Sequence, residues 1–572
     1  MDRRLPRDYT TRSENAHFLD LPTGTVHQHH VYAFLRYLVE RGNFSRVIDI
    51  GCGSGEKLKG LPTLTEVICI DTADMQPLVT QNLPNAQFLQ CDLESGVPQL
   101  EFELTGTVIV CSDVIEHMRE PEILIRQLAE FAEVCPYVLI STPERVRARG
   151  LLDMGPPGNP AHTMEWTADE LSRFLEDCGL PPGFLLGYTY NNDQDWAKNT
   201  LLAVAGREAT FQRPTATLCV AAILNVYNER DIIEPVARYL RNQQIQVHVV
   251  DNWSNDGTSE ILARLKEEGV CHNVLRFPEQ DTQEYNWRAL LEHTAQYASR
   301  LDCDWAIHYD ADEFRSGPWP NATLAEAITL VDHLGYSAVD FTLLNFVFTD
   351  DESPAAFSPE RFKFFDFGRH PAHLQQVKAW KNTGQIVDLA SSGGHIANFS
   401  GMRVFPLKFL TKHYPLRSVT HASTKIHRDR LPRIEREHRE LGWHSHYDTY
   451  CTMPNLQPWR KYEAINFDPN VFSAEFLVER LSGLGIETEP RAVPNSGTLF
   501  HYLDAQIDNN KRLQSRIGDL EAENARLHAA SDCLEQQIAA LQSQLTDLTQ
   551  SKIWRFTARL RRLLIAPGSP KA

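Results

Sequence analysis

The chain of 572 residues is long enough for about three or four domains of ordinary size. Its formal net charge of −19 argues against a general nucleic-acid-binding protein, because contacts to phosphates require a basic surface. The 11 scattered cysteines, the lack of a signal-like N-terminus and the lack of an apolar segment of roughly 20 residues predict a reduced, cytoplasmic protein.

A polar segment, residues 1–31, precedes the first predicted domain, residues 32–206. Within this domain short apolar segments alternate with amphipathic ones, which is typical of parallel strands joined by helices. We expect buried strands at 46–50, 66–70, 86–91, 107–112 and 137–142, and a crossover helix at 121–133. The closely spaced segments 184–190 and 199–206 favour an antiparallel hairpin.

A glycine loop follows the first of these strands, in the sequence RVIDIGCGSGEKL. Gly51, Gly53 and Gly55 allow a sharp turn that brings backbone amides close to a ligand. Asp49 lies just before the loop, and Asp71 and Asp92 end the next two strands, where a carboxylate can bind a ribose or an adenine amino group. Glu56 stands where a dinucleotide-binding loop has glycine, which favours a nucleoside without a diphosphate.

Residues 32–206 resemble the class I S-adenosylmethionine-dependent methyltransferases, which have a Rossmann-like fold. The resemblance implies that Asp49 and the glycines belong to the cofactor motif, that Asp71 binds the ribose and that Asp92 contacts the adenine. In the segment SDVIEHMREPEIL, the resemblance places Ser112 and Asp113 near the methionine end of S-adenosyl-L-methionine, with His117 lining the site.

Methyl transfer to oxygen can use a base that removes the hydroxyl proton. His117 and His162 are the candidates, and we predict His117 as the catalytic residue. The alternative for each is a structural histidine. No metal-ligand spacing is recognisable in this half of the sequence.

A linker at 207–216 leads to a second predicted α/β domain, residues 217–487. Strand-like segments recur at 217–227, 245–254, 273–279 and 304–314. From about residue 317 the pattern becomes irregular and rich in aromatic residues, histidine and arginine, so we expect a site built from loops there.

Two carboxylates, Asp310 and Asp312, end a predicted strand in WAIHYDADEF. At a strand end such a pair can bind a hard divalent cation, and the alternative is a simple acidic loop. Asn225 and Glu229 follow the first strand of this domain, and Asp251 ends the second, where it suits a uracil or ribose contact.

This layout resembles the GT-A glycosyltransferases and is close to glycosyltransferase family 2, well over 218–314 and more loosely to 487. The resemblance implies a nucleotide-sugar donor, with Asp310 and Asp312 holding Mg²⁺ or Mn²⁺, Asp251 at the nucleotide base and sugar transfer with inversion. The remaining nucleotide-sugar contacts are assigned to Asn225, Glu229, His413 and Arg417, and a further metal ligand to His395. We predict Glu313 as the acceptor base, with Asp350, Asp351 and Asp366 as alternatives.

The C-terminal part begins with a linker at 488–502 and continues with a heptad pattern at 503–552. Leucine recurs every seventh residue, at 513, 520, 527, 534, 541 and 548. This pattern predicts an α-helical coiled coil, and Asn524 in its seam favours a parallel dimer. A single amphipathic helix packed on the rest of the chain is the alternative. The basic amphipathic tail, 553–572, predicts contact with a membrane surface or, alternatively, a solvated helix end.

These features predict a bifunctional enzyme that transfers a sugar and a methyl group to a glycan or glycolipid acceptor. We expect it to act in bacterial cell-surface polysaccharide assembly, as a cytoplasmic homodimer peripheral to the inner membrane face. Two alternatives stay open: a methyltransferase whose second domain only binds glycan, and an assembly scaffold in which one catalytic domain is degenerate.

Overall fold

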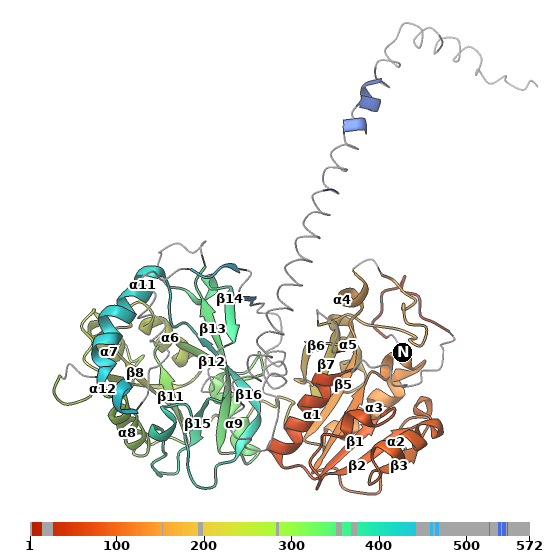
Figure 1. Ribbon diagram of the computed structural model, residues 1–572, viewed down its shortest axis with the longest axis horizontal. Coiled ribbons are helices and arrows are strands. Elements are labelled where there is room, and N and C mark those ends of the chain that lie inside the picture. The colour runs from red at the N-terminus through yellow and green to blue at the C-terminus, as the bar shows by residue number, and fades with distance from the viewer. Residues whose placement is uncertain are drawn as a thin grey trace, which may run out of the picture. The chain divides into compact units, whose positions relative to one another are not determined.

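Figure 1 shows the computed structural model of the chain, which divides into two compact units, Met1–Ile486 and Glu487–Ala572. The described residues are 3–13, 27–150, 153–192, 198–281, 285–349, 357–367, 375–441, 458–461, 464–467, 526, 536–538, 540–544, 546 and 557. The first unit contains two α/β sheets, and each of the predicted sites lies at one of them.

The first sheet has seven strands in the order β3-β2-β1-β4-β5-β7-β6. Its strands are β1 (Arg46–Ile50), β2 (Glu66–Asp71), β3 (Gln87–Gln90), β4 (Thr107–Ser112), β5 (Tyr137–Pro143), β6 (Leu185–Thr189) and β7 (Thr200–Ala205). The strands from β1 to β5 pair in parallel, whereas β7 is antiparallel to both β5 and β6. The expected parallel strands and the terminal hairpin are therefore confirmed, and this order is that of a Rossmann-like methyltransferase sheet.

Amphipathic helices cover the first sheet. They are α1 (His29–Gly42), α2 (Gln76–Asn82), α3 (Pro121–Ala132), α4 (Arg145–Arg149) and α5 (Ala168–Asp177). Helix α3 forms where the sequence predicts it, because Leu124, Ile125 and Leu128 recur at helical spacing and bury one face. Thr167 precedes helix α5, and its side chain and that of Glu170 form a capping box.

The second sheet has ten strands, with the main order β10-β9-β8-β11-β15-β13-β14-β17. They are β8 (Val220–Val226), β9 (Gln246–Asp251), β10 (Asn273–Arg276), β11 (Trp305–Asp310), β12 (Glu313–Ser316), β13 (Ala338–Val347), β14 (Phe364–Phe367), β15 (Val377–Lys381), β16 (Val404–His413) and β17 (Ile465–Asn466). Strands β10, β9, β8 and β11 are parallel, and β15 runs antiparallel to β11. Strand β16 pairs with β12 and β13.

The helices of this part are α6 (Ile233–Asn242), α7 (Thr258–Glu267), α8 (Trp287–Ala298), α9 (Leu324–His333), α11 (Val419–Ser423) and α12 (Leu431–Leu441). A π-helical stretch, η7 (Thr424–Arg430), connects α11 directly to α12. Such stretches are rare and often occur at functional sites.

The expectation of a loop-built region after residue 317 is wrong for much of that region. Strands β13 and β16 each run for ten residues and form part of the second sheet. Their sequence lacks a clear strand pattern because polar side chains are buried in it together with apolar ones. Lys408 and Asp340, for example, form a buried ion pair 3.0 Å long.

Both sheets of the first unit contribute to one apolar core, and helix α1 contacts both of them. Buried residues occur around most of α1, which explains its largely apolar sequence. Tyr37 on this helix donates a 2.9 Å hydrogen bond to the Pro406 carbonyl of β16. Tyr336 donates to Glu208 at 2.8 Å, and Trp319 donates to the Ala209 carbonyl at 2.7 Å.

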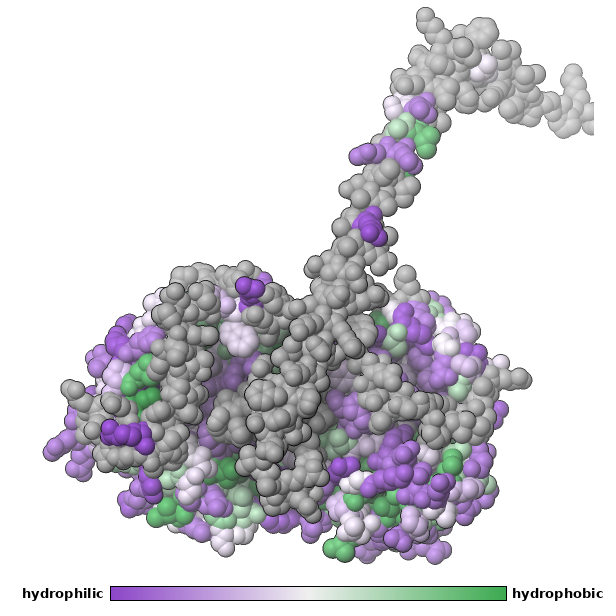
Figure 2. All heavy atoms as spheres, in the orientation of Figure 1, coloured by the Kyte–Doolittle hydropathy of each residue, from purple (hydrophilic) through white to green (hydrophobic). Residues whose placement is uncertain are grey.

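Hydrophilic side chains cover most of the described surface in the view of Figure 2. No helix within the described ranges is both long and apolar enough to cross a membrane. In the second unit the described helical residues include Ile538 and Leu541, which are 53% and 64% exposed. Most heptad leucines, Asn524 and nearly all of the basic tail lie outside the described residues, so the coiled coil stays a prediction.

Replacing Trp319 with alanine should lower the free energy of unfolding by about 3–5 kcal/mol, because a large buried side chain is lost. Trp319 is 2% exposed and packs against Phe211, Phe405 and Phe409. Denaturant unfolding checks this value, with Leu64→Ala, at a side chain 95% exposed, as the control. Equal effects of the two substitutions would contradict a structural role for this contact.

Candidate active sites

The loop after β1 has the backbone conformation that its glycines permit. Gly51, Gly53 and Gly55 have φ angles of +76°, +55° and +71°. A Cβ atom at Gly51 would lie 2.3 Å from Cγ2 of Val114, so both the backbone angle and the available space require glycine there. The chain order reverses between β1 and β4, and such a switch point is where open parallel sheets bind ligands.

Asp71 at the end of β2 faces this loop. Its carboxylate accepts hydrogen bonds from the Gly53 amide at 2.8 Å and the Thr72 amide at 2.7 Å. Burial raises the pKa of Asp71, whereas the two amides lower it, and the net direction is upward. The carboxylate is therefore fixed beside the glycine loop, as a ribose contact requires.

The other two predicted acids have different surroundings. Asp49 is fully buried and accepts a hydrogen bond from the Tyr32 hydroxyl at 2.9 Å, which connects β1 to α1. Asp92 is exposed beyond β3, and its side chain accepts from the Glu94 amide at 3.1 Å. Asp49 thus supports the loop from the protein interior, whereas Asp92 is accessible to a ligand.

Ser112 is the last residue of β4, and Asp113 follows it at the same edge of the sheet. The Ser112 hydroxyl lies 2.8 Å from the Ser141 hydroxyl, and Gln28 donates to Asp113 at 2.6 Å. Asp113 has a positive φ of +55°, a conformation uncommon for a residue with a side chain. Burial raises the pKa of this carboxyl group.

His117 and His162 are brought together, with ring centroids 4.7 Å apart. Nδ1 of His117 lies 3.0 Å from the Ala161 carbonyl oxygen, and Nδ1 of His162 lies 2.7 Å from the Glu165 carboxylate. Burial and the neighbouring His162 lower the pKa of His117 to about 4, so its ring is neutral at physiological pH.

The sequence analysis missed Glu116, which is completely buried beside these histidines. Glu116, His117 and His162 each present a ligand atom, and these atoms lie within 4.8 Å of one another. The sequence shows no metal-ligand spacing in this half, yet folding brings together three possible ligands there. No spacing motif reveals the set, because His162 comes from a loop far along the chain.

In the second sheet the predicted donor-site residues meet at the carboxyl ends of parallel strands. Asp310 pairs in register with Asn225, and Asp251 pairs with Val226. The Asn225 side chain is held by His308 at 3.2 Å and Thr294 at 3.0 Å, so it belongs to a buried network.

Asp251 organises the loop that follows its strand. Its carboxylate accepts from the Ser254 amide at 3.0 Å and from the Ser259 hydroxyl at 2.7 Å. The side chain is almost fully buried. Its first role in this conformation is therefore to hold the loop in place.

Each carboxylate of the predicted metal motif forms an ion pair with a lysine that the sequence analysis missed. Lys378 of β15 lies 2.5 Å from Asp310, and Lys425 of η7 lies 2.8 Å from Asp312. Burial alone would raise the pKa of each carboxyl group, but the neighbouring lysine lowers it by more, so both pKa values are depressed. His413 lies 3.5 Å from Asp312, and although burial lowers its pKa, that carboxylate raises it more.

Glu229 connects this pair to a second group of charges. Its carboxylate lies 2.6 Å from Arg417 and 2.7 Å from Lys425. Arg417 also binds Asp231 through two hydrogen bonds of 2.7 Å. The predicted residues Glu229, Asp312 and Arg417 are therefore parts of one continuous network of buried charges.

The remaining predicted residues are more dispersed. Glu313 is buried and paired with Arg315 and, at 3.6 Å, with Lys378. His395 contacts Gln376 at 3.0 Å, and Asp366 lies on β14. Asp350 and Asp351 lie outside the described residues, and the base role of Glu313 stays a prediction.

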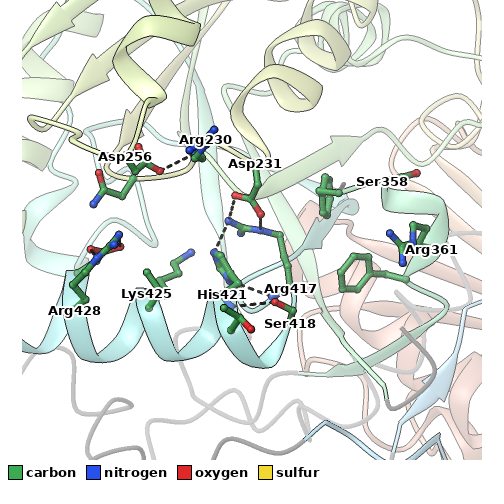
Figure 3. Close-up of a pocket in the computed structure, with 16 residues that line it drawn as sticks. Arg230, Asp231, Asp256, Ser358, Arg361, Arg417, Ser418, His421, Lys425 and Arg428 are labelled. Atoms are coloured by element: carbon green, nitrogen blue, oxygen red, sulfur yellow. Dashed lines mark hydrogen bonds and ion pairs between the residues drawn. The ribbon is translucent and has the colours of Figure 1, made fainter. Parts of the chain in front are cut away.

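A pocket of about 630 Å³ opens beside the charge network. Five cationic side chains and three carboxylates line it: Arg230, Arg361, Arg417, Lys425 and Arg428 with Asp231, Asp256 and Asp429. Figure 3 shows His421, Lys425 and Arg428 directed from one helical segment toward Asp231 and Asp256. The cationic excess suits a phosphorylated ligand.

Carboxylates are the ligands that Mg²⁺ and Mn²⁺ prefer, so Asp310 and Asp312 fit such a cation by ligand type. A cation that binds both must replace ammonium groups already in contact with them. Among the described residues, two groups of three side chains have possible metal-ligand atoms within 4.8 Å of one another. Neither group includes Asp310, Asp312 or His395. The second such group is Glu229, Asp231 and His421.

Known methyltransferases are similar to part of this chain. The ubiquinone biosynthesis O-methyltransferase of Cupriavidus pinatubonensis is 26% identical over 160 residues, which are 26% of this chain and 64% of that protein. The protein of the same name from Chromobacterium violaceum is 29% identical over 188 residues, covering 28% of this chain and 77% of that protein. The chain thus spans less than two thirds of the Cupriavidus relative.

Two solved structures are also similar. One is a S-adenosylmethionine-dependent methyltransferase from Aquifex aeolicus, 20% identical, with a TM-score of 0.23, covering 32% of this chain and 93% of that one. The other is human N-acetylserotonin methyltransferase in complex with S-adenosylmethionine, 14% identical, with a TM-score of 0.23, covering 31% and 52%.

Two families match the chain itself. Residues 27–182 match the family described as methyltransferase domain, and residues 222–318 match glycosyl transferase family 2. The first match contains the glycine loop and the His117 cluster, and the second contains Asp251, Asp310 and Asp312. The chain therefore combines a methyltransferase domain with a glycosyl transferase family 2 domain.

Proposed function

We propose that the chain is a bifunctional transferase. The first domain would transfer a methyl group from S-adenosylmethionine to a hydroxyl group, and the second would transfer a sugar from a nucleotide donor. The observation that carries this proposal is the pair of separate parallel-sheet edges, each with its own set of ligand-binding side chains. The relatives named as O-methyltransferases support oxygen as the methyl acceptor.

The glycine loop and the carboxylates near it fit S-adenosylmethionine. The glycine loop leaves space where a Cβ atom would collide with Val114, and Asp71 faces this loop with its carboxylate. Asp71 would bind both ribose hydroxyls, and the exposed Asp92 would bind the adenine amino group. The donor's sulfonium would supply an electrophilic methyl group, and Ser112 and Asp113 lie where the methionine end would bind.

Asp71→Asn should weaken the binding of S-adenosylhomocysteine by about 1.5–3 kcal/mol, because hydrogen bonds to a charged carboxylate are lost. Isothermal titration calorimetry measures this change. The matched control is Asp74→Asn, at an exposed aspartate three residues further along the chain, which should bind as the unchanged chain does. Equal binding by both variants would show that Asp71 does not contact the methyl donor.

The pocket of the second domain supports a nucleotide-sugar donor in a GT-A-like site. Its cationic side chains can neutralise a diphosphate, and Arg417 can offer a planar pair of donors. We propose that Asp310 and Asp312 bind Mg²⁺ or Mn²⁺ together with the diphosphate. Lys378 and Lys425, which contact these carboxylates, would then become available to the phosphate oxygens. The cation would supply charge neutralisation of the departing diphosphate.

Sugar transfer or donor hydrolysis should stop in a chelator and return when Mn²⁺ or Mg²⁺ is added. Asp312→Asn should abolish transfer without changing the binding of the methyl-donor product. The control is Asp302→Asn, an exposed aspartate just before β11. A nucleotide-release assay with a panel of sugar donors measures both effects. Full activity in chelator would instead indicate that the lysines alone neutralise the charge of the diphosphate.

The panel also separates the alternatives. Release of nucleotide diphosphate from one donor would exclude a purely glycan-binding second domain and a degenerate one. We propose glycans or glycolipids as acceptors and cell-surface polysaccharide assembly as the setting, both on the resemblance to family 2 enzymes. A peripheral contact of the basic tail with the inner membrane face belongs to the same proposal.

The heptad region is proposed to join two copies of the chain. Ile538 and Leu541 occupy adjacent apolar positions of the repeat and are largely exposed in the single chain. Their exposure supports the proposal that a second helix packs against them. A parallel dimer is the simplest closure, since Asn524 would then face its copy.

The full chain should sediment as a dimer, and a chain truncated before Leu513 should sediment as a monomer. The two sheets belong to a compact unit that ends at Ile486, so truncation should leave both of them folded. Analytical ultracentrifugation measures both species, and circular dichroism verifies the fold of the truncated chain. Identical sedimentation behaviour would show that the heptad region does not cause dimerisation.

A further inference from the structure

We propose that Glu116, His117 and His162 bind a divalent transition-metal cation in the methyltransferase domain. The three side chains come from η4 (Ile115–His117) and from the loop before α5. Their ligand atoms lie within 4.8 Å of one another, close enough for a single ion to contact all three. Two imidazoles and one carboxylate are a set that suits Mn²⁺, Co²⁺ or Zn²⁺.

An unsatisfied carboxylate oxygen is the independent observation that points to a ligand. Glu116 is fully buried, and its Oε2 atom accepts a hydrogen bond from the Thr142 hydroxyl at 2.9 Å. Its other oxygen, Oε1, is buried and has no hydrogen-bond partner. Because a buried polar atom without a partner is costly, such an atom requires an explanation, and a bound cation supplies one.

The hydrogen bonds of the two imidazoles prepare them for metal binding. Nδ1 of His117 lies 3.0 Å from the Ala161 carbonyl oxygen, so this nitrogen donates its proton and leaves Nε2 as the lone-pair atom. Nδ1 of His162 donates likewise to Glu165, at 2.7 Å. Arg149 in turn pairs with Glu165 at 2.8 Å, which fixes the acceptor. Histidine metal ligands commonly have such outer hydrogen bonds.

Nε2 of His162 is 2.9 Å from the Asn159 side-chain nitrogen, which donates a hydrogen bond to it. A cation would take this lone pair in place of the Asn159 amide. Only one hydrogen bond is exchanged for a metal bond, and the ring orientation that Glu165 imposes is kept.

The position of the cluster indicates what the cation would bind next. His117 lies four residues after Asp113, at the edge of the sheet where the proposed methyl donor binds. Three protein ligands leave coordination positions open. We infer that the open position takes the acceptor hydroxyl, and this step rests on the proposed function of the first domain. The metal would lower the pKa of that hydroxyl group. Its oxygen would then bond to the methyl carbon as the carbon–sulfur bond breaks, leaving a thioether, while the hydroxyl proton passes to solvent.

The test is Mn²⁺ binding to the full chain, measured by electron paramagnetic resonance of the free ion. All proteins carry Asp310→Asn, Asp312→Asn and His421→Gln, so that neither the donor-site carboxylates nor the group of Glu229, Asp231 and His421 contributes. Glu116→Gln should weaken Mn²⁺ binding by at least about tenfold, because a charged ligand is lost. The matched control is Glu120→Gln, an exposed glutamate of the same segment, which should bind Mn²⁺ unchanged.

Two further measurements keep the result interpretable. Binding of S-adenosylhomocysteine reports whether the Glu116→Gln protein is folded and whether the methyl-donor site exists at all. Co²⁺ absorption spectra report imidazole ligation, which His117→Gln should alter. Equal Mn²⁺ affinity of the Glu116→Gln and Glu120→Gln proteins, with intact S-adenosylhomocysteine binding, would overturn the metal site and leave the methyl-donor site standing. The absence of S-adenosylhomocysteine binding by every protein would overturn the proposed function instead.

Discussion

Both candidate sites depend on one geometric constraint: neighbouring parallel strands end at the same edge of a sheet. In the first sheet this constraint places the loop after β1 beside Asp71 of β2 and the residues that follow β4. In the second sheet it places Asp251 and Asp310 at the carboxyl ends of β9 and β11, the two strands that flank β8. Side chains from distant parts of the sequence can therefore meet at one ligand, which short loops alone could not achieve.

The two sites manage buried charge in different ways. In the second domain Asp310, Asp312 and Glu229 are each paired with lysine or arginine, as buried carboxylates must be. The charges of this network are compensated within the chain itself, so the proposed donor diphosphate would enter by exchange of partners. In the first domain Glu116 has a buried oxygen without a hydrogen-bond partner, and the proposed cation would supply one.

The sequence predicted features with a local signal and missed those formed by distant residues. The strands of the first sheet and the glycine loop were predictable, because apolar segments and glycine spacing are local properties. Lys378 and Lys425 were not, since each meets its aspartate only after folding. Strands β13 and β16 were missed for a related reason: buried ion pairs such as Lys408 with Asp340 remove the regular apolar pattern.

The most direct test of the central claim, two independent nucleotide sites in one chain, is sequential titration calorimetry of the full protein. S-adenosylhomocysteine is titrated to saturation, and then UDP, GDP, CDP, ADP and TDP are each titrated with Mn²⁺ present. The account predicts one equivalent of the first ligand and one of a nucleoside diphosphate, with neither affinity changed by the other ligand. Displacement of S-adenosylhomocysteine by the diphosphate, or the failure of all five diphosphates to bind, would contradict it.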